Sequence, residues 1–225
     1  MMRSEQFQLN APRSGVHHHL SERIGGGRVT FQDVSPKFRP NALDSRIAME
    51  LLAMEGTPQA IQHFAAHCNE LSAYGYWYFL STLWVSYSGH SDLALWRRLF
   101  SARRPHRAAS IMKPSELTSL QDLPDTLQVF RAHREKETDW ISYTLAYGVA
   151  VRFAVERGVR EIVEYRAQKS DVLALFLRRQ EQEVIILDPA SVQRMRTMPL
   201  TESSVFAPTN EGEKAELSLG REAAA

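Results

Sequence analysis

Cysteine is nearly absent from this chain: Cys68 is the only one among 225 residues. An intramolecular disulfide therefore cannot form, and a zinc module built from several cysteines is excluded. Residues 1–20 also lack the continuous apolar run of a secretory signal. We expect a protein of a reducing compartment, either cytoplasmic or delivered into a target cytoplasm.

Long apolar runs and an excess of one charge are missing as well. The one membrane candidate, residues 71–91, has no Asp, Glu, Lys or Arg, but its five Ser and four Tyr make it too polar to span a bilayer easily. The 27 basic and 26 acidic residues give a formal net charge of +1. This balance argues against a polybasic, histone-like protein but leaves room for a local basic patch. We expect no membrane segment.

The remaining composition is that of an ordinary globular protein, with 44% hydrophobic and 24% charged residues. A chain of 225 residues forms one large domain or two small ones and can bury about 70% of its unfolded surface. Changes in composition divide it into a loosely structured leader, a helical region, a strand-rich core and a polar mobile tail. Their predicted bounds are 1–40, 41–120, 121–190 and 191–225.

Cap residues and apolar spacing predict five helices in the helical region. They begin at about Asn41, Thr57, Ser72, Ser91 and Pro114. Alternating and β-branched runs then predict strands, with one helix over 147–155 between them. The strands cover 127–133, 140–144, 160–167 and 183–187, and a weak edge strand covers 29–34 in the leader.

Three short motifs follow one another in the strand-rich core. Phe130-Arg131 lies within a predicted strand, Ser142-Tyr143-Thr144 ends the next, and Glu181-Gln182-Glu183 leads into a third. In this order they resemble the signature of the mono-ADP-ribosyltransferases of the Arg-Ser-Glu class, a family typified by bacterial toxins. The flanking text WISYTLAYGVAVRFA is also similar to that family's strand and following helix. The resemblance covers residues 124–189, under a third of the chain.

The resemblance implies an α+β fold, in which an N-terminal helical region precedes an ADP-ribosyltransferase-like split β-sandwich with two small packed sheets around an NAD cleft. It implies an enzyme that cleaves the bond between nicotinamide and ribose in NAD and transfers ADP-ribose to a protein or nucleic-acid acceptor. NAD is then a co-substrate, and no metal is expected. A glycohydrolase and an inactive, transferase-like scaffold remain alternatives.

Cleavage of that bond builds positive charge on the ribose, as in glycoside hydrolysis. By the resemblance, Glu183 stabilises this charge and grips a ribose hydroxyl, while Ser142 bonds the ribose and orients Glu183. The planar guanidinium of Arg131 suits the diphosphate, because it makes charge-assisted, two-pronged hydrogen bonds. Outside the family context, Arg131 is more simply paired with Asp125 or Glu135.

Neighbouring residues receive supporting roles. Tyr143 and Thr144 form part of the pocket wall. His133, two residues beyond Arg131 on the same strand face, either assists the NAD grip or is a structural or exposed histidine. Three features depart from the family pattern: Arg131 and Ser142 are only eleven residues apart, Ala132 follows Arg131 where the family often has glycine, and Thr144 replaces the final Ser. These departures predict a compact form of the fold.

Glu181 and Glu183 are two residues apart, so in an extended chain their side chains point to one face. By the resemblance, a Glu at position 181 accompanies arginine acceptors, because a nearby base helps a guanidinium lose its proton. The preceding Phe176, Arg178 and Arg179 occupy the place of the family's substrate-contacting turn. Alternatively, the two acids form a solvated strand edge.

The helical region offers weaker candidates. A basic stretch near the predicted end of the fourth helix either contacts nucleic acid or an acidic protein, or merely complements the helix terminus. It comprises Arg97, Arg98, Arg103, Arg104 and Arg107. His63, His67 and Cys68 have a spacing that can bind zinc on a helix, but packing or surface roles are favoured. The aromatic residues between positions 74 and 87 are expected to be core.

Overall fold

The structure, a computed structural model, describes most of the chain. The described residues are 21–24, 27–30, 33–87, 92–137 and 140–200. The chain divides into two units, residues 1–34 and residues 35–225. In the first unit, β1 (Ser21–Ile24) and β2 (Gly27–Thr30) form an antiparallel hairpin. The predicted edge strand at 29–34 therefore overlaps only the end of β2.

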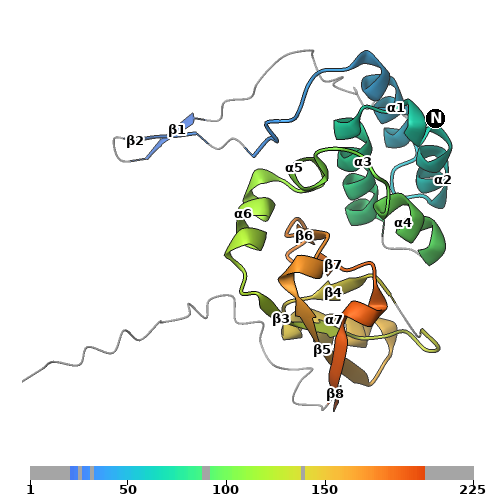
Figure 1. The fold of residues 1–225 in the computed structure, drawn as a ribbon, viewed down its shortest axis with the longest axis vertical. Coiled ribbons are helices and arrows are strands. Elements are labelled where there is room, and N and C mark those ends of the chain that lie inside the picture. Colours follow the sequence, from blue (N-terminus) through green and yellow to red (C-terminus); the bar gives the residue numbers. More distant parts are fainter. Residues whose placement is uncertain (1–20, 25–26, 31–32, 88–91, 138–139, 201–225) are drawn as a thin grey trace, which may run out of the picture. The chain divides into compact units, whose positions relative to one another are not determined.

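Six helices occupy the first part of the second unit within the described residues (Figure 1). They are α1 (Ala42–Leu52), α2 (Pro58–His67), α3 (Ala73–Ser86), α4 (Leu93–Phe100), α5 (Arg107–Ile111) and α6 (Pro114–Asp122). The predicted cap at Asn41 is confirmed, because its side chain accepts hydrogen bonds from the backbone N–H groups of Leu43 and Asp44. The prediction missed α5, since five residues are too few to show an apolar period.

One carboxylate fastens α1 to α3. Asp44 accepts a hydrogen bond from the backbone N–H of Ser72, the N-cap of α3, at 2.8 Å and another from the Ser72 hydroxyl. Gly75 is required beside this contact, because a Cβ at that position would collide with the Asp44 carboxylate. Trp77 of α3 and Trp96 of α4 are almost fully buried behind it, which confirms the expected core role for part of the aromatic run.

The remainder of the second unit is one six-stranded antiparallel sheet with a helix against it. The strands are β3 (Thr126–Arg131), β4 (Ser142–Thr144), β5 (Glu161–Gln168), β6 (Ala174–Phe176), β7 (Glu183–Ile185) and β8 (Gln193–Pro199). Their spatial order is β6-β7-β4-β3-β5-β8. The helix α7 (Tyr147–Arg157) packs Ala150 and Ala154 against Phe130 and Ile162. The predicted α+β class is confirmed, but the described strands of this unit form one sheet instead of two.

The sheet is almost divided between β3 and β4. In the described chain these strands share one residue pair, Phe130 with Thr144. By contrast, β3 pairs with β5 along its whole length, and β4 pairs with β7 along its whole length. We call the divergence of β3 and β4 beyond that pair the seam. Arg131 and Ser142 lie at the seam, past the last pairing of the two strands.

The last strand corrects the predicted tail. β8 pairs with β5 from Glu161 opposite Pro199 to Arg166 opposite Gln193, so the tail predicted to begin at 191 is wrong for these residues. The rest of that segment, residues 201–225, lies outside the described residues.

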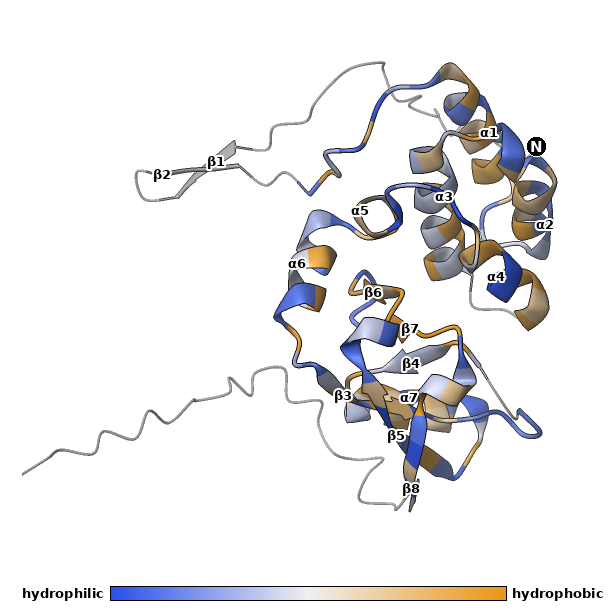
Figure 2. Ribbon diagram, viewed as in Figure 1, coloured by the Kyte–Doolittle hydropathy of each residue, from blue (hydrophilic) through white to orange (hydrophobic). Residues whose placement is uncertain are grey.

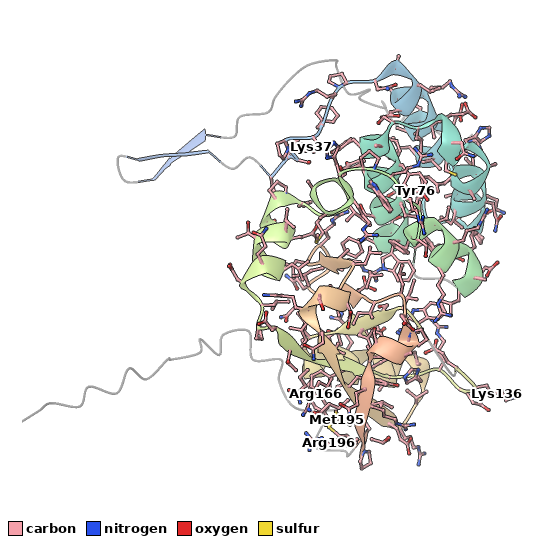
Figure 3. All side chains as sticks on the ribbon, in the orientation of Figure 1. Lys37, Tyr76, Lys136, Arg166, Met195 and Arg196 are labelled. Atoms are coloured by element: carbon pink, nitrogen blue, oxygen red, sulfur yellow. The ribbon has the colours of Figure 1, made fainter. Side chains whose placement is uncertain are left out.

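β8 was not predicted from the sequence, because almost none of its side chains is buried. Its side chains are nearly all exposed and mostly hydrophilic (Figure 2), and an ion pair of 2.6 Å joins Arg196 to Glu164 of β5. Figure 3 places Met195 and Arg196 near Arg166 of β5 at one end of the sheet. A strand without a buried face lacks the alternating apolar pattern by which strands are found.

The helical region and the sheet share one hydrophobic core. Its main cluster contains Phe64 and Trp77 from the helices together with Val129 and Ile185 from the sheet. The predicted boundary near residue 120 therefore separates two kinds of secondary structure within one unit, and is not a domain boundary. None of the helices in the described part of the chain is long and apolar enough to cross a membrane.

A buried ion pair fastens α6 to the loop between β6 and β7. Glu116 is 1% exposed, and its carboxylate accepts hydrogen bonds from Nε and Nη2 of Arg178, both at 3.1 Å, and from the backbone N–H of Leu177 at 3.0 Å. Arg178 also donates to the Ser81 hydroxyl at 3.1 Å and the Ile111 carbonyl at 2.9 Å. The pair thus joins helices α3, α5 and α6 to the sheet.

Removing one partner of this pair tests its role. Glu116→Ala is expected to lower the free energy of unfolding by about 3–5 kcal/mol, because Arg178 then stays buried without its counter-charge. The measurement is urea unfolding followed by circular dichroism. The control, Arg46→Ala, removes an exposed ion pair with Glu50 and should hardly move the midpoint. Equal shifts for the two variants would contradict the assignment.

Candidate active site

The side chain of Arg131 bridges the seam. Its Nη1 donates to the backbone carbonyl of Ser142 on β4 at 2.8 Å. Its Nε and Nη2 both donate to Oε2 of Glu137, at 2.9 and 2.7 Å. Arg131 is only 6% exposed, and burial lowers the pKa of its guanidinium while the charge of Glu137 acts in the opposite direction. The guanidinium thus takes the place of the backbone pairing that β3 and β4 lack here.

Glu137 is a site residue that sequence reasoning missed. The chain turns back at Lys136, whose φ of 64° is in the left-handed region, and the backbone N–H of Glu137 donates to the carbonyl of Arg134 at 3.0 Å. Figure 3 shows Lys136 projecting from this turn. Burial alone raises the pKa of Glu137, but hydrogen bonding to His133 and the charge of Arg131 lower it to about 2. The only sequence signal for this ion pair was an acidic residue six positions after Arg131.

His133 contacts Glu137, which is the partner of Arg131, and Tyr165. Its Nδ1 is 3.1 Å from Oε2 of Glu137, and its Nε2 is 2.7 Å from the hydroxyl of Tyr165 on β5. It is not among the residues that line the cavity described below. The structure therefore gives His133 the structural role that was the alternative prediction, since it contacts the partner of Arg131 and has no face on the cavity.

Ser142 and Glu183 meet on one face of the sheet. Thr144 of β4 is opposite Glu183 of β7, which places Ser142 diagonally across from the carboxylate. The Ser142 hydroxyl donates to Oε1 of Glu183 at 2.5 Å. Burial raises the pKa of Glu183 to about 7, and the charge of Glu181 acts in the same direction, while hydrogen bonds from Ser142 and Trp84 counteract the rise. Glu183 therefore changes its charge near neutral pH.

Glu181 reaches the same cavity by a different backbone path from the one predicted. Gln180 and Gln182 have φ values of 55° and 44°, so residues 181–183 are not an extended run, and β7 begins only at Glu183. The Thr144 hydroxyl donates to the backbone carbonyl of Glu181 at 2.6 Å and holds the loop in place. The alternation argument was thus wrong, although both carboxylates line the cavity.

These residues surround a cavity of about 730 Å³. The predicted residues that line it are Arg131, Ser142, Tyr143, Thr144, Arg179, Glu181 and Glu183. The structure adds aromatic residues from the helical region and from the β3–β4 loop. These are Trp84, Tyr87, Trp96 and Trp140. The helical region therefore forms one wall of the cavity.

A second wall is cationic. Arg134, from the β3–β4 loop, and Arg157, the last residue of α7, line the cavity together with Arg131. Nη1 of Arg157 donates to the backbone carbonyl of Ala132 at 2.5 Å. Burial, together with the positive charges of Arg131 and Arg134, lowers the pKa of Arg157 to about 10, although the charges of Glu137 and Glu156 act in the opposite direction. Such mutual repulsion marks a place where an anion would be stabilised.

No protein family, curated protein or solved structure matches this chain. The residues that line the cavity therefore provide the indications of its chemistry. Among the described residues, no group of three or more His, Cys, Asp or Glu could hold a metal ion. The cavity instead combines an aromatic wall with four carboxylates and four guanidinium groups, those of Glu135, Glu156, Glu181, Glu183, Arg131, Arg134, Arg157 and Arg179. This set suits a ligand that carries phosphate, sugar and ring parts.

Two predicted substrate contacts are corrected. Phe176 is 2% exposed within β6 and belongs to the main core. Arg178 is engaged with Glu116, and neither residue lines the cavity. Only Arg179 of that segment does, with Nη1 donating to the backbone carbonyl of Val85 at 2.9 Å. The prediction missed β6, a strand of three residues that is too short to show alternation.

The basic stretch of the helical region has mixed roles. Arg104 donates to the backbone carbonyls of Leu71 and Cys68, at 3.0 and 2.8 Å, and lies over the ring of Tyr76. Its guanidinium therefore stabilises the packing of the helices. The Cζ atom of Arg107 lies 6.0 Å from the centre of the Trp77 ring. Arg98, Arg103 and Arg107 are exposed, and Arg97 is partly buried.

The histidines of α2 make carboxylate contacts instead of a zinc site. Nε2 of His63 is 2.8 Å from Glu50, and Nδ1 of His67 is 2.6 Å from Glu70. Cys68 is a free thiol that donates to the backbone carbonyl of Ala65. The three residues thus follow the packing and surface reading that the sequence favoured.

The Glu137 carboxylate is expected to support the seam. Glu137→Ala should lower the free energy of unfolding by about 3–5 kcal/mol, because Arg131 is left buried without a counter-charge. The folded pKa of about 2 lies below the ordinary value of 4.5. The contribution of Glu137 is therefore complete above about pH 5 and declines as the pH falls toward 2.

Urea midpoints at several pH values from about 6 down to about 3 measure both effects. Glu135→Ala is the matched control, since Glu135 is exposed and lies two residues away on the same loop. It should keep the wild-type midpoint and the wild-type acid dependence. If Glu137→Ala behaves like this control, the ion pair does not hold the seam.

Proposed function

We propose that this chain is an NAD-dependent mono-ADP-ribosyltransferase. The observation that carries the proposal is the convergence of Arg131, Ser142 and Glu183 on one cavity, from three different strands. The Ser142 hydroxyl bonds the Glu183 carboxylate, which is the contact that the resemblance implies. The order of the motifs, their strand context and their flanking sequence together predicted these residues as a site.

Glu183 supplies the electrostatic part of the mechanism. The bond between nicotinamide and ribose breaks as positive charge develops on the ribose. An ionised carboxylate beside that sugar stabilises the charge, and Ser142 keeps the carboxylate in a fixed orientation. Because the pKa of Glu183 is about 7, its ionised fraction increases through the neutral range and is about half at pH 7.

The cationic wall suits the diphosphate of NAD. Three N–H groups of Arg131 are already engaged by Glu137 and Ser142, and its side chain is nearly buried. We assign Arg131 mainly to holding the seam, with a long-range charge toward the diphosphate. Arg134 and Arg157 are more accessible and supply direct donors. Guanidinium groups bind phosphate through paired hydrogen bonds.

The aromatic wall offers faces for the ring parts of the ligand. Trp84 is in the last turn of α3, Tyr87 caps that helix, and Trp140 precedes β4, so the rings come from two separate parts of the chain. The cavity of about 730 Å³ is within the usual range for a cofactor-sized ligand. Large aromatic faces stack well on flat heterocycles such as nicotinamide and adenine.

Glu181 favours a guanidinium as acceptor. Its Oε1 is 3.1 Å from Nε of Arg179 and 3.8 Å from Nη2 of Arg152, so this carboxylate already attracts guanidinium groups. A carboxylate in that place can orient an attacking nitrogen and take the proton that it loses. Transfer to an arginine is therefore favoured over simple hydrolysis of NAD.

Glu183→Gln tests the mechanism. We expect nicotinamide release from NAD to fall about 10²–10³-fold, because the neutral amide cannot stabilise the charged transition state. The assay uses NAD labelled in its adenosine part together with a small guanidinium acceptor, and it measures nicotinamide and labelled adduct separately. Glu135→Gln, a change at another cavity-lining carboxylate, should retain most of the activity.

The outcomes separate the related functions. Nicotinamide release without an adduct would indicate a glycohydrolase. Absence of NAD binding in calorimetry would indicate a scaffold without activity. Equal rates for the wild type and Glu183→Gln would exclude the proposed role of this carboxylate.

The pH dependence gives an independent test. Since the carboxylate of Glu183 must be ionised and its pKa is about 7, kcat/KM for NAD should rise with pH, pass half of its maximum near pH 7 and level off about one pH unit higher. Ser142→Ala removes a hydrogen bond that lowers this pKa, so the midpoint of the rise should move to higher pH. A profile that stays flat or falls between about pH 6 and 8 would contradict the assignment.

A further inference from the structure

Arg179 occupies the place that an arginine acceptor would take. Its Nε is 3.1 Å from Oε1 of Glu181, the carboxylate assigned to the acceptor, and its side chain lines the same cavity as Glu183. The side chain is 42% exposed, so it remains accessible from the cavity. The guanidinium therefore stands where the proposed chemistry would be carried out.

Contacts on both sides of Arg179 in the sequence hold its backbone in place. The preceding residue, Arg178, is anchored in the core by Glu116. After Arg179, the Thr144 hydroxyl and the Leu145 N–H hold the carbonyls that follow, at 2.6 and 3.0 Å. At the tip of the side chain, Nη1 donates to the carbonyl of Val85 on α3. Arg179 is thus fixed from both sides of its loop and from the opposite wall.

Arg152 is a poorer candidate, although it also faces Glu181. Its Nη2 is 3.8 Å from the Glu181 carboxylate, and its Nε is equally far from Glu156 on its own helix. It is not among the residues that line the cavity. Proximity to Glu181 alone would leave two candidates, but position at the cavity selects Arg179.

We propose that the protein ADP-ribosylates its own Arg179. This inference rests on the proposed function, because it uses the same cavity and the same carboxylates. A new bond forms between a terminal guanidinium nitrogen of Arg179 and C1′ of the nicotinamide ribose. The bond between C1′ and the nicotinamide nitrogen breaks, and its electron pair leaves with neutral nicotinamide. Glu181 takes the proton from the attacking nitrogen and passes it to solvent.

Self-modification at this position would limit the enzyme. The added ADP-ribose would occupy the cavity next to Glu181, where an external acceptor has to bind. Each molecule that modifies itself is then closed to further transfer. The protein would therefore lose transferase activity in proportion to the adduct on Arg179, and the loss would depend on NAD but not on an external acceptor.

The test uses the purified full chain with NAD and no other acceptor. We expect nicotinamide release together with a mass increase of one ADP-ribose, located at Arg179 by peptide mapping. Arg179→Lys should lose this adduct, and Glu183→Gln should lose it as well. Arg103→Lys, a change at an exposed arginine outside the cavity, should keep it. The fraction modified per unit time should be the same at low and high protein concentration, as for a reaction within one molecule.

Two results would overturn the inference in different ways. If nicotinamide is released but the adduct is absent or lies on another residue, self-modification of Arg179 is wrong and the proposed function stands. If no nicotinamide is released, both proposals are wrong. Preincubation with NAD supplies a further check: it should lower later transfer to a guanidinium acceptor in the wild type, and the ratio with and without preincubation should be close to one in Arg179→Lys.

Discussion

The site depends on the contacts that the buried guanidinium of Arg131 makes with Glu137 and Ser142. A cation can occupy the gap between two diverging strands only if its charge and its donors are satisfied there, since an unpaired buried charge is very costly. Glu137 supplies the counter-charge, and the Ser142 carbonyl accepts a hydrogen bond from Nη1 of Arg131. This contact sets the position of β4 beside β3, and the position of β4 in turn directs the Ser142 hydroxyl to Glu183.

The helical region is part of the same construction. Trp84 and Tyr87 complete the cavity from α3, and the Glu116–Arg178 pair ties α6 to the loop that carries Arg179 and Glu181. The helices therefore shape the site in two ways, as a wall and as an anchor for a loop. This explains why the second unit is continuous although its two parts differ in secondary structure. It also explains why a loop with two positive-φ glutamines can keep one conformation.

Local signals predicted much of the fold, and long-range contacts account for most of what they missed. Asn41 caps α1 through its nearest neighbours, so its role is visible in sequence, and β5 is visible because its apolar residues Ile162, Val163 and Ala167 are buried. β8 shows no such pattern, because its partner is β5 and its side chains remain in solvent. At the site, the motif order selected residues that do line one cavity. Glu137 and Trp84 could not be selected in this way, since their roles arise from a turn geometry and from a helix distant in sequence.

The single residue pair between β3 and β4 has a mechanical consequence. Each half of the sheet has continuous pairing within itself, so the joint at Phe130 and Thr144 is its most compliant line. Across that joint, side chains replace the backbone ladder: Arg131 bonds the Ser142 carbonyl, and Val129 of β3 shares one hydrophobic core with Ile185 of β7. The alignment of the two halves therefore depends on side-chain identity, so substitutions there would alter the cavity while leaving each ladder intact.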